Sequence, residues 1–242
     1  MDPTRLLRED HHVHSTVSDG SGSLEDNVCA AAQRGVGLLG FVEHVRRDTR
    51  WVQSYVHEVR RLRNRHPLTL TCGIEAKILD LDGTLDLPRD VEGVDRIVIA
   101  DHQLPGPGGP IHPADARAAV TAGIVSPGVL VRMLVAGTVE ALQRHPGSLI
   151  AHLFSLLPKL GVSEEDVPED LVSELAEAAL RSGATLELSE RWMCPSPAVA
   201  RVFYEIGVPI VASTDAHEPG AIGRYDFVRR TISHLCAVSP RG

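Results

Sequence analysis

Seven short apolar runs, rich in Val, Ile and Leu, alternate along the chain with stretches of helical periodicity. Strands that are buried on both faces of a parallel sheet have continuous apolar runs of this kind. Strand–helix units that repeat without a break into two halves favour a closed or nearly closed barrel. The runs cover residues 8–14, 37–42, 69–75, 96–100, 148–152, 184–188 and 208–213. We therefore predict an α/β barrel built from seven parallel strands.

Helices are predicted between most of these runs. Ser23, with Asp26 three positions later, is typical of a helix N-cap, and Ser126-Pro127 begins another helix in the same manner. The expected helices cover residues 24–34, 51–65, 127–144, 168–181 and 197–205. Two segments interrupt the alternation. Residues 79–88 contain an Asp-Gly turn and predict a β-hairpin, and the Gly- and Pro-rich residues 103–124 predict a loop that covers the site as a lid.

Side chains that bind metals recur at the ends of these runs. In barrels of parallel strands, active sites lie at the C-terminal ends of the strands, and alternate residues of a strand point to the same side. Nine side chains are placed in this way: His12, His14, Asp19, His44, Glu75, His102, His152, Asp215 and His217. Imidazole and carboxylate suit zinc, iron and manganese. With three or four protein ligands per catalytic ion, nine candidates predict two or three divalent ions.

The remaining histidines have a simpler interpretation as solvated or capping residues, and His11 points away from the His12–His14 pair. They lie outside the ordered set at the strand ends: His57, His66, His112, His145 and His234. A lone His-x-His pair is weak evidence for a metal. The prediction therefore depends on the whole ordered set.

The composition of the chain limits which partners it is expected to bind and in which cellular compartment it is expected to lie. With 24 basic and 32 acidic residues in 242, the net charge is −8, which disfavours a nucleic-acid binder. The four cysteines form no Cys-x-x-Cys pair, so a thiolate zinc site and a disulfide framework are not expected. The first residues, MDPTRLLRED, contain no apolar signal core. We expect one cytoplasmic domain over residues 1–242, without a membrane partner; composition leaves the oligomeric state open.

Six segments together resemble the PHP (polymerase and histidinol phosphatase) family of metal-dependent phosphoesterases. They are DHHVHSTVSDGSG, GFVEH, GIEAKILDLDGTLD, IADH, AHLF and ASTDAH, in the family's order between about residues 9 and 220. The resemblance implies a distorted seven-stranded (β/α) barrel with a trinuclear metal centre. It assigns His12, His14, Glu75 and Asp215 to the first metal, bridging Glu75 with His102 and His152 to the second, and Asp19, His44 and His217 to the third.

Two positions deserve comparison with the family pattern. Val42-Glu43-His44 stands where the family usually has Thr-Asp-His, so a longer carboxylate lies beside a candidate ligand. A carboxylate in this place can shift the ligand that it orients. Asp19, in Ser18-Asp19-Gly20, is either the ligand of the third metal or an ordinary turn residue.

The expected activity is hydrolysis of a phosphate monoester of a small metabolite by a metal-bound hydroxide. Asp215 and His217 are candidates to assist in proton transfer, although metal ligation competes with that role. Arg191, Arg224 and Arg46 are candidates to bind the phosphate, because guanidinium matches its geometry; each is equally explained as a surface arginine in an ion pair, with Glu190 near enough to provide one. A phosphodiesterase or nuclease, a metallohydrolase acting on an amide or imine carbon, and a non-catalytic metal-binding module are the alternatives.

Overall fold

Seven parallel strands form the central sheet of this computed structural model, which describes residues 2–237. Their order in the sheet is β1-β2-β3-β4-β7-β8-β9, which follows their order along the chain. The strands are β1 (Glu9–Val13), β2 (Leu38–His44), β3 (Thr69–Lys77), β4 (Arg96–Ala100), β7 (Leu149–Ile150), β8 (Thr185–Ser189) and β9 (Ile210–Ser213). The seven predicted strands are all present.

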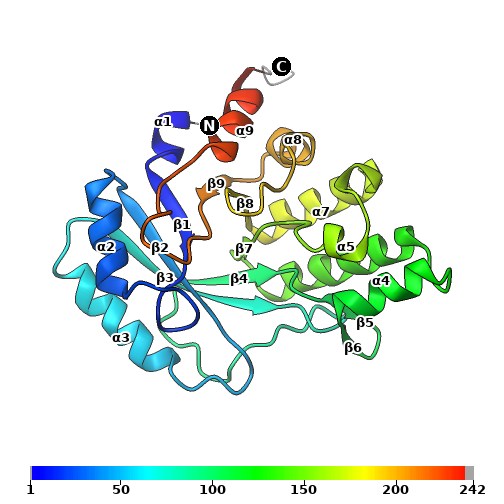
Figure 1. Ribbon diagram of the computed structural model, residues 1–242, viewed down its shortest axis with the longest axis horizontal. Helices are drawn as coiled ribbons and strands as arrows, with labels where there is room; N and C mark the ends of the chain where they lie inside the picture. The colour runs from blue at the N-terminus through cyan, green and yellow to red at the C-terminus, as the bar shows by residue number, and fades with distance from the viewer. Residues whose placement is uncertain (1, 238–242) are drawn as a thin grey trace.

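The two edges of this sheet approach each other. The His14 N–H donates to the Ala216 carbonyl at 2.9 Å, and Val13 pairs with Ala216 in a parallel bridge. Figure 1 shows β1 and β9 next to one another at the centre of the molecule. The sheet is therefore nearly closed into a barrel, as predicted.

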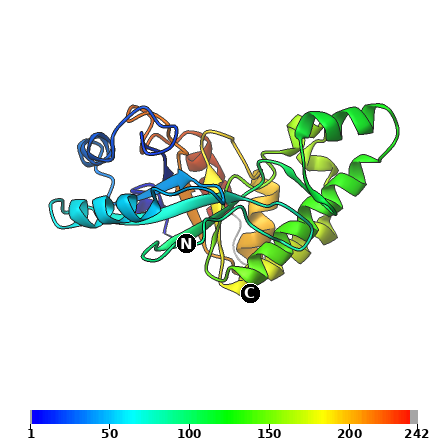
Figure 2. The ribbon, with the colours of Figure 1, turned by 90° about the horizontal axis from the view of Figure 1, so that it is seen from below.

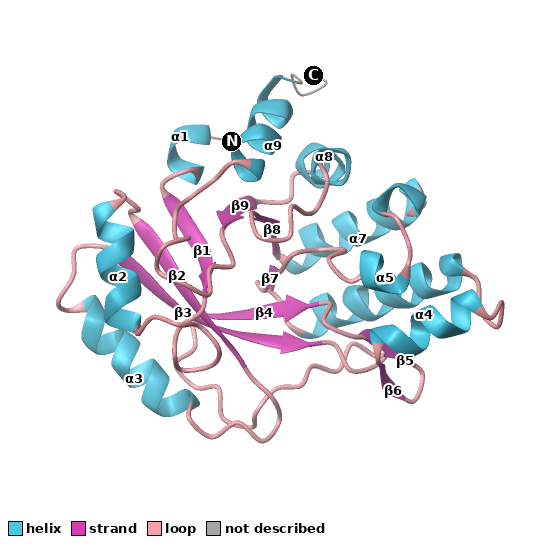
Figure 3. Ribbon diagram, viewed as in Figure 1, coloured by secondary structure: helices cyan, strands magenta, loops and turns pink. Residues whose placement is uncertain are grey.

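Helices surround the sheet and bury their apolar faces against it. In Figure 3 the strands converge at the centre, with α2 (Leu24–Gln33) and α3 (Val52–Arg63) on one side. Figure 2 shows α5 (Pro127–Arg144) and α7 (Glu169–Ser182) on the opposite side. The others are α1 (Pro3–Leu6), α4 (Pro113–Thr121), α6 (Leu157–Leu160), the 3₁₀ turn η1 (Glu164–Asp166), α8 (Pro197–Ile206) and α9 (Phe227–Ala237). The predicted helices are all found, with ends shifted by up to two residues.

Helix α3 illustrates how the sequence produces these elements. Five apolar side chains recur at helical spacing and are buried: Val52, Tyr55, Val56, Val59 and Leu62. Complete burial of such a side chain stabilises the fold by roughly 1.5–3 kcal/mol. Helix α2 begins as predicted, because Ser23 and Asp26 form a reciprocal capping box.

The two irregular segments differ from the predictions. Residues 103–124 are not an open loop, because they contain the antiparallel strands β5 (Leu104–Gly106) and β6 (Gly109–Ile111) followed by α4. Residues 79–88 form a tight turn with a single antiparallel bridge, Ile78 to Leu85, instead of two paired strands. Gly83, with φ +72°, lets this turn pack directly on α5, since a Cβ there would lie 2.2 Å from the Ala141 nitrogen of that helix.

The inner face of the barrel differs from the face that contacts the helices. Alternate residues of a strand point to opposite faces, so Ile74 and Ile99 belong to the large core shared with the helices. On the inner face a small separate cluster contains Val42, Val98 and Leu149. Further along the same strands the inner face becomes polar. Among residues 2–237, no helix is both long and apolar enough to cross a lipid bilayer.

Candidate metal centre

The polar end of the barrel brings together all nine side chains predicted from the strand ends. His12 and His14 point inward from β1 because they are two residues apart, and Glu75 occupies an inner position near the end of β3. His12, His14, Glu75, His152 and Asp215 are buried. Asp19, His44, His102 and His217 are partly exposed. We name these two sets of candidate ligands the inner ligands and the outer ligands.

The first group of ligand atoms lies around Asp215. The His12 and His14 Nε2 atoms are 2.9 Å apart, and Asp215 Oδ1 lies 3.1 Å from His14 Nε2. Glu75 Oε2 is 3.6 Å from the Nε2 atoms of both histidines. Four side chains, from β1 and the residue after it, from β3 and from the loop after β9, therefore surround one point.

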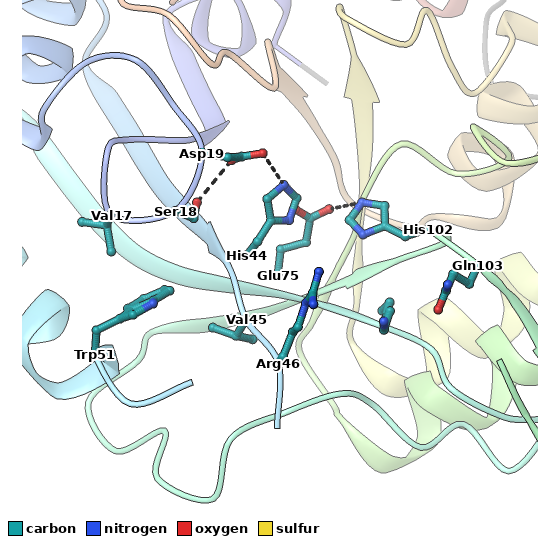
Figure 4. A pocket seen from close by; sticks show the side chains of 11 residues that line it. Val17, Ser18, Asp19, His44, Val45, Arg46, Trp51, Glu75, His102 and Gln103 are labelled. Atoms are coloured by element: carbon teal, nitrogen blue, oxygen red, sulfur yellow. Dashed lines mark hydrogen bonds and ion pairs between the residues drawn. The ribbon is translucent and has the colours of Figure 1, made fainter. Parts of the chain in front are cut away.

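Two further groups lie on either side of the Glu75 carboxylate. Its Oε1 atom is 3.1 Å from His102 Nε2 and 3.0 Å from His152 Nε2. On the other side, Asp19 Oδ2 is 3.4 Å from the Nε2 atoms of both His44 and His217. Figure 4 shows Asp19, His44, Glu75 and His102 side by side along one wall of a pocket. Asp19 thus faces two imidazoles instead of turning towards solvent.

Two buried carboxylate oxygens test whether cations fit this arrangement. Glu75 Oε2 and Asp215 Oδ1 have no hydrogen-bond donor among the described residues. A buried polar atom without a partner costs about 1–3 kcal/mol, and more when it is charged. Glu75 Oε2 lies 2.8 Å from Nδ1 of the outer ligand His44, and Asp215 Oδ1 lies 3.1 Å from Nε2 of the inner ligand His14. A divalent cation among these atoms would be bound by the carboxylate oxygens and by the lone pairs of unprotonated imidazoles. The residues present therefore fit a metal centre.

The charges of the inner ligands are interdependent. Burial opposes ionisation of Glu75, yet the charges of His102 and His12 hold the pKa of its carboxyl well below the usual value. Asp215 behaves similarly, because His12 and His14 lower its pKa despite burial. Burial lowers the pKa of His14 to about 4, so this imidazole is neutral at pH 7 and ready to bind a metal.

The carboxylates around His12 and His152 favour the protonated forms of these imidazoles. Burial alone would lower the pKa of His12, but Glu187, Glu75 and Asp215 raise it well above the ordinary value. For His152 the same burial is overcome by Asp101 and Glu75. A cation that replaced these protons would take over the neutralisation of the carboxylates.

Among the described residues, four other than glycine have positive φ, and two of these four follow strands at this site. His152, after β7, has φ 28°, and Asp215, after β9, has φ 49°. Residues other than glycine rarely adopt positive φ, and such strain clusters at functional sites. The strain turns both side chains towards the ring of ligands.

Three contacts that were not predicted from the sequence hold the inner ligands. Glu187 on β8 is completely buried, and its Oε2 lies 2.8 Å from His12 Nδ1. The Asp101 carboxylate lies 3.2 Å from His152 Nδ1, and it also accepts bonds from Ser155 Oγ and the Leu156 N–H. The Trp192 indole N–H donates to Asp215 Oδ2 at 2.6 Å. Such partners fix the ring orientation of metal-bound histidines.

A sequence signal existed for Glu187 but not for Asp10, which is equally buried. Glu187 lies between two leucines in LEL, where a carboxylate must find a partner inside the barrel, whereas Asp10 lies in the mostly polar strand EDHHV. Asp10 accepts bonds from the Thr214 N–H, Thr214 Oγ1 and the Gly223 N–H. It therefore fixes the segment that carries Asp215 and His217.

Glu43, the residue that departs from the family pattern, holds the loop that carries Asp19. Its carboxylate accepts bonds from the Ser15 and Ser18 hydroxyls and from the Ser18 N–H. Burial raises the pKa of Glu43 to about 7. The longer side chain thus reaches the loop after β1.

The three candidate arginines lie in different surroundings. Arg191 donates to the Asp215 carbonyl at 3.3 Å and contacts His217 Nδ1. Arg224 lines a pocket of about 590 Å³ with Arg191, whereas Arg46 lines a separate pocket of about 610 Å³ beside the outer ligands.

The expectation that Glu190 pairs with an arginine is wrong, because both of its oxygens accept N–H groups at the start of α9, from Phe227 and Val228.

Known proteins support the resemblance at the level of the fold. No protein-family model matches the chain. Histidinol phosphate phosphatase from Lactococcus lactis, solved with zinc, L-histidinol and phosphate, aligns with a TM-score of 0.68 and 16% identity over 95% of this chain and 92% of that chain. The putative histidinol phosphatase of Listeria monocytogenes aligns with a TM-score of 0.63 and 14% identity, over 89% of this chain and 97% of that one. The resemblance to the PHP family is confirmed for the fold.

A curated relative matches a shorter segment. Phosphoribosyl 1,2-cyclic phosphate 1,2-diphosphodiesterase from Eggerthella lenta is 40% identical over 74 residues, which are 31% of this chain. The match spans about a quarter of that relative, 26% of its length.

Proposed function

We propose that the chain is a metal-dependent phosphatase that hydrolyses a phosphate monoester of a small metabolite. The observation that carries the proposal is the ring of nine ligands around Glu75 and Asp215, with a carboxylate oxygen of each lacking a donor. The fold shared with two histidinol phosphatases supports the phosphate ester as substrate.

The three groups of ligand atoms support three ion sites. His12, His14, Glu75 and Asp215 would hold the first ion, and Glu75, His102 and His152 the second. Asp19, His44 and His217 would hold the third. Zinc, iron or manganese accepts these ligands. Bound ions of this kind lower the pKa of a water molecule to about 7 and neutralise phosphoryl oxygens.

The side chains have distinct tasks around this centre. Asp215 is ionised at neutral pH because its pKa is lowered, so we assign it to metal binding and not to proton donation. His217 is likewise assigned to metal binding, with its Nδ1 against Arg191, so the proton for the leaving oxygen would come from water. Arg191 and Arg224 line the same pocket and would bind the phosphoryl group, as guanidinium groups do.

A phosphodiesterase is the second candidate, and the segment shared with the cyclic phosphodiesterase of Eggerthella lenta favours it. Assays with 4-nitrophenyl phosphate and bis(4-nitrophenyl) phosphate, each with added manganese, separate the two. We expect the monoester to be hydrolysed with the higher kcat/KM. A preference for the diester would replace the first proposal with the second. If inorganic phosphate neither bound nor inhibited, a metallohydrolase acting on carbon would be favoured instead.

A further inference from the structure

A pocket beside the outer ligands has a wall that the metal centre does not use. It measures about 610 Å³, within the range of small-molecule sites, and the outer ligands Asp19, His44 and His102 form its inner wall. The lining also contains an aromatic ring, two cations and an amide: Trp51, Arg46, Lys77 and Gln103. Figure 4 shows Arg46 and Trp51 below the ligands and Gln103 beside His102.

The two cations are positioned by the strands that carry the ligands. Arg46 follows His44 by two residues, and Figure 4 shows its side chain extending towards Glu75. Its backbone N–H donates to Thr49 Oγ1, and its guanidinium forms no ion pair with another residue between 2 and 237. Lys77 follows Glu75 by two residues on the same face of β3. Its Nζ lies 3.6 Å from Asp86, which leaves other ammonium donors for a ligand.

Trp51 contributes a flat, braced surface. Its indole meets Tyr55 edge to face, with ring centroids 5.8 Å apart and an interplanar angle of 88°. Tyr55 is itself fixed, because its buried hydroxyl donates to the Gly73 carbonyl at 3.0 Å. A rigid aromatic surface of this kind stacks on planar rings. Gln103 adds a side-chain oxygen that is buried and without a donor.

The second pocket is less suited to an additional anion. Arg191 is already engaged with Asp215 and His217, and Arg224 shares the lining with four acids, of which only Asp215 is a candidate metal ligand: Glu190, Asp215, Glu218 and Asp226. In the pocket beside the outer ligands, the only acids of the lining are Asp19 and Glu75, both candidate metal ligands. Negative charge is therefore accepted better beside Arg46 and Lys77.

We propose that this pocket binds the leaving group of the substrate, and that this group carries a planar ring and a second anionic group. Trp51 would stack on the ring, and Arg46 with Lys77 would bind the anion, either a carboxylate or a second phosphate. The proposal rests on the proposed phosphatase function. In the reaction water adds to phosphorus, the ester P–O bond breaks, and the leaving oxygen takes the proton, so the products are inorganic phosphate and an anionic alcohol.

Non-hydrolysable phosphonates test the pocket without the influence of leaving-group chemistry. Inhibition constants would be measured for methylphosphonate, benzylphosphonate, (3-carboxybenzyl)phosphonate and 1,3-xylylene bisphosphonate. We expect the benzyl group to tighten inhibition about 10-fold and the second anion to tighten it about 10-fold more, as stacking and charge-assisted hydrogen bonds do. The last two compounds distinguish a carboxylate from a phosphate. Equal inhibition by benzylphosphonate and both of its anionic derivatives would overturn the proposal.

Single substitutions in the pocket test which residues produce the tighter inhibition. Arg46→Met and Lys77→Met should each remove most of the tighter inhibition that the second anion produces. Trp51→Leu should remove most of the tighter inhibition that the ring produces. Arg50→Met is the matched control, because Arg50 is exposed on the same loop and outside the pocket lining; it should leave both gains unchanged. An equal loss in Arg46→Met and Arg50→Met would contradict the assignment. Failure of the phosphatase function is a separate result, since no aryl phosphate would then be hydrolysed and no phosphonate would inhibit.

Discussion

The inner and outer ligands use the same residue types in opposite surroundings. The side chains of His12 and His14 are 0% exposed, whereas His44 is 33% and Asp19 is 51% exposed. The inner ligands form hydrogen bonds with Glu187, Asp101 and Trp192. Among the outer ligands, Asp19, His44 and His102 line one open pocket and His217 lines another. A single centre thus combines a rigid, desolvated half with a half that solvent and substrate reach.

The difference has a consequence for metal binding. Desolvated carboxylates interact strongly with a cation because the local dielectric constant is low, and their orientation is fixed in advance. Exposed ligands lose side-chain freedom when they bind, and water competes with them. We therefore expect the ions at the inner ligands to be held tightly and the ion at Asp19, His44 and His217 to exchange.

The largest effect is expected from removing an inner ligand. His14→Ala should lower kcat/KM by at least about 10³-fold, because the lost charge stabilisation is several kcal/mol and each 1.36 kcal/mol is tenfold in rate. Steady-state kinetics with 4-nitrophenyl phosphate, alongside circular dichroism to check folding, would measure it. Activity near that of the unaltered protein would refute the metal mechanism.

Protons provide a second test of the inner half. His12 and His152, whose pKa values are raised, should each release a proton when ions bind, whereas His14 releases none at pH 7. Below the raised pKa values, each released proton weakens binding about tenfold per pH unit, so affinity falls as pH falls. Titration calorimetry in buffers of different ionisation enthalpy counts the protons. Zinc binding that released no proton at pH 7 would contradict the raised pKa values of these two histidines.

Removing the Glu187 contact that orients His12 should have an intermediate effect on metal affinity and activity. Glu187→Gln keeps the shape of the side chain but weakens its hold on His12, so metal affinity or activity should fall about 10- to 100-fold. Competition with a chelating dye would measure the affinity. Glu174→Gln, an exposed change on α7, is the control and should alter neither quantity. Equal behaviour of the two variants would mean that the Glu187 contact does not orient His12.

The smallest effect is expected at the outer ligands. Asp19→Asn should lower activity about 10-fold at limiting manganese and recover at high manganese, because an exposed ligand contributes less than a buried one. Activity against metal concentration measures the recovery. A loss of activity that no manganese concentration reverses would place Asp19 among the essential ligands. It would also remove the proposed difference between the inner and the outer ligands.

Much of the barrel and all nine convergent side chains followed from local patterns. Apolar runs and caps identify strands and helices, and the C-terminal ends of parallel strands gather ligands such as His102 and His152 without knowledge of the exact packing. Helix α9 was not predicted. Its start depends on Glu190, far away in the sequence, which accepts its first N–H groups.

Contacts between distant segments account for the other omissions. Residues 103–124 form a hairpin and a helix because β5 packs on α5, where Gly137 leaves room for Pro105. The partnership of His12 with Glu187 joins residues 175 positions apart. Hydrophobic periodicity predicts which face of a strand is buried, but it does not predict which side chain of a distant strand contacts that face.

Elemental analysis of the purified protein tests the central claim most directly. The metal content per chain would be measured before and after brief dialysis against a chelator, together with hydrolysis of 4-nitrophenyl phosphate. We predict two or three ions of zinc, iron or manganese per chain, with those at the inner ligands retained after dialysis and activity falling as the remaining ions are lost. A chain that hydrolysed the ester with less than one ion bound, at a rate insensitive to the chelator, would contradict the account.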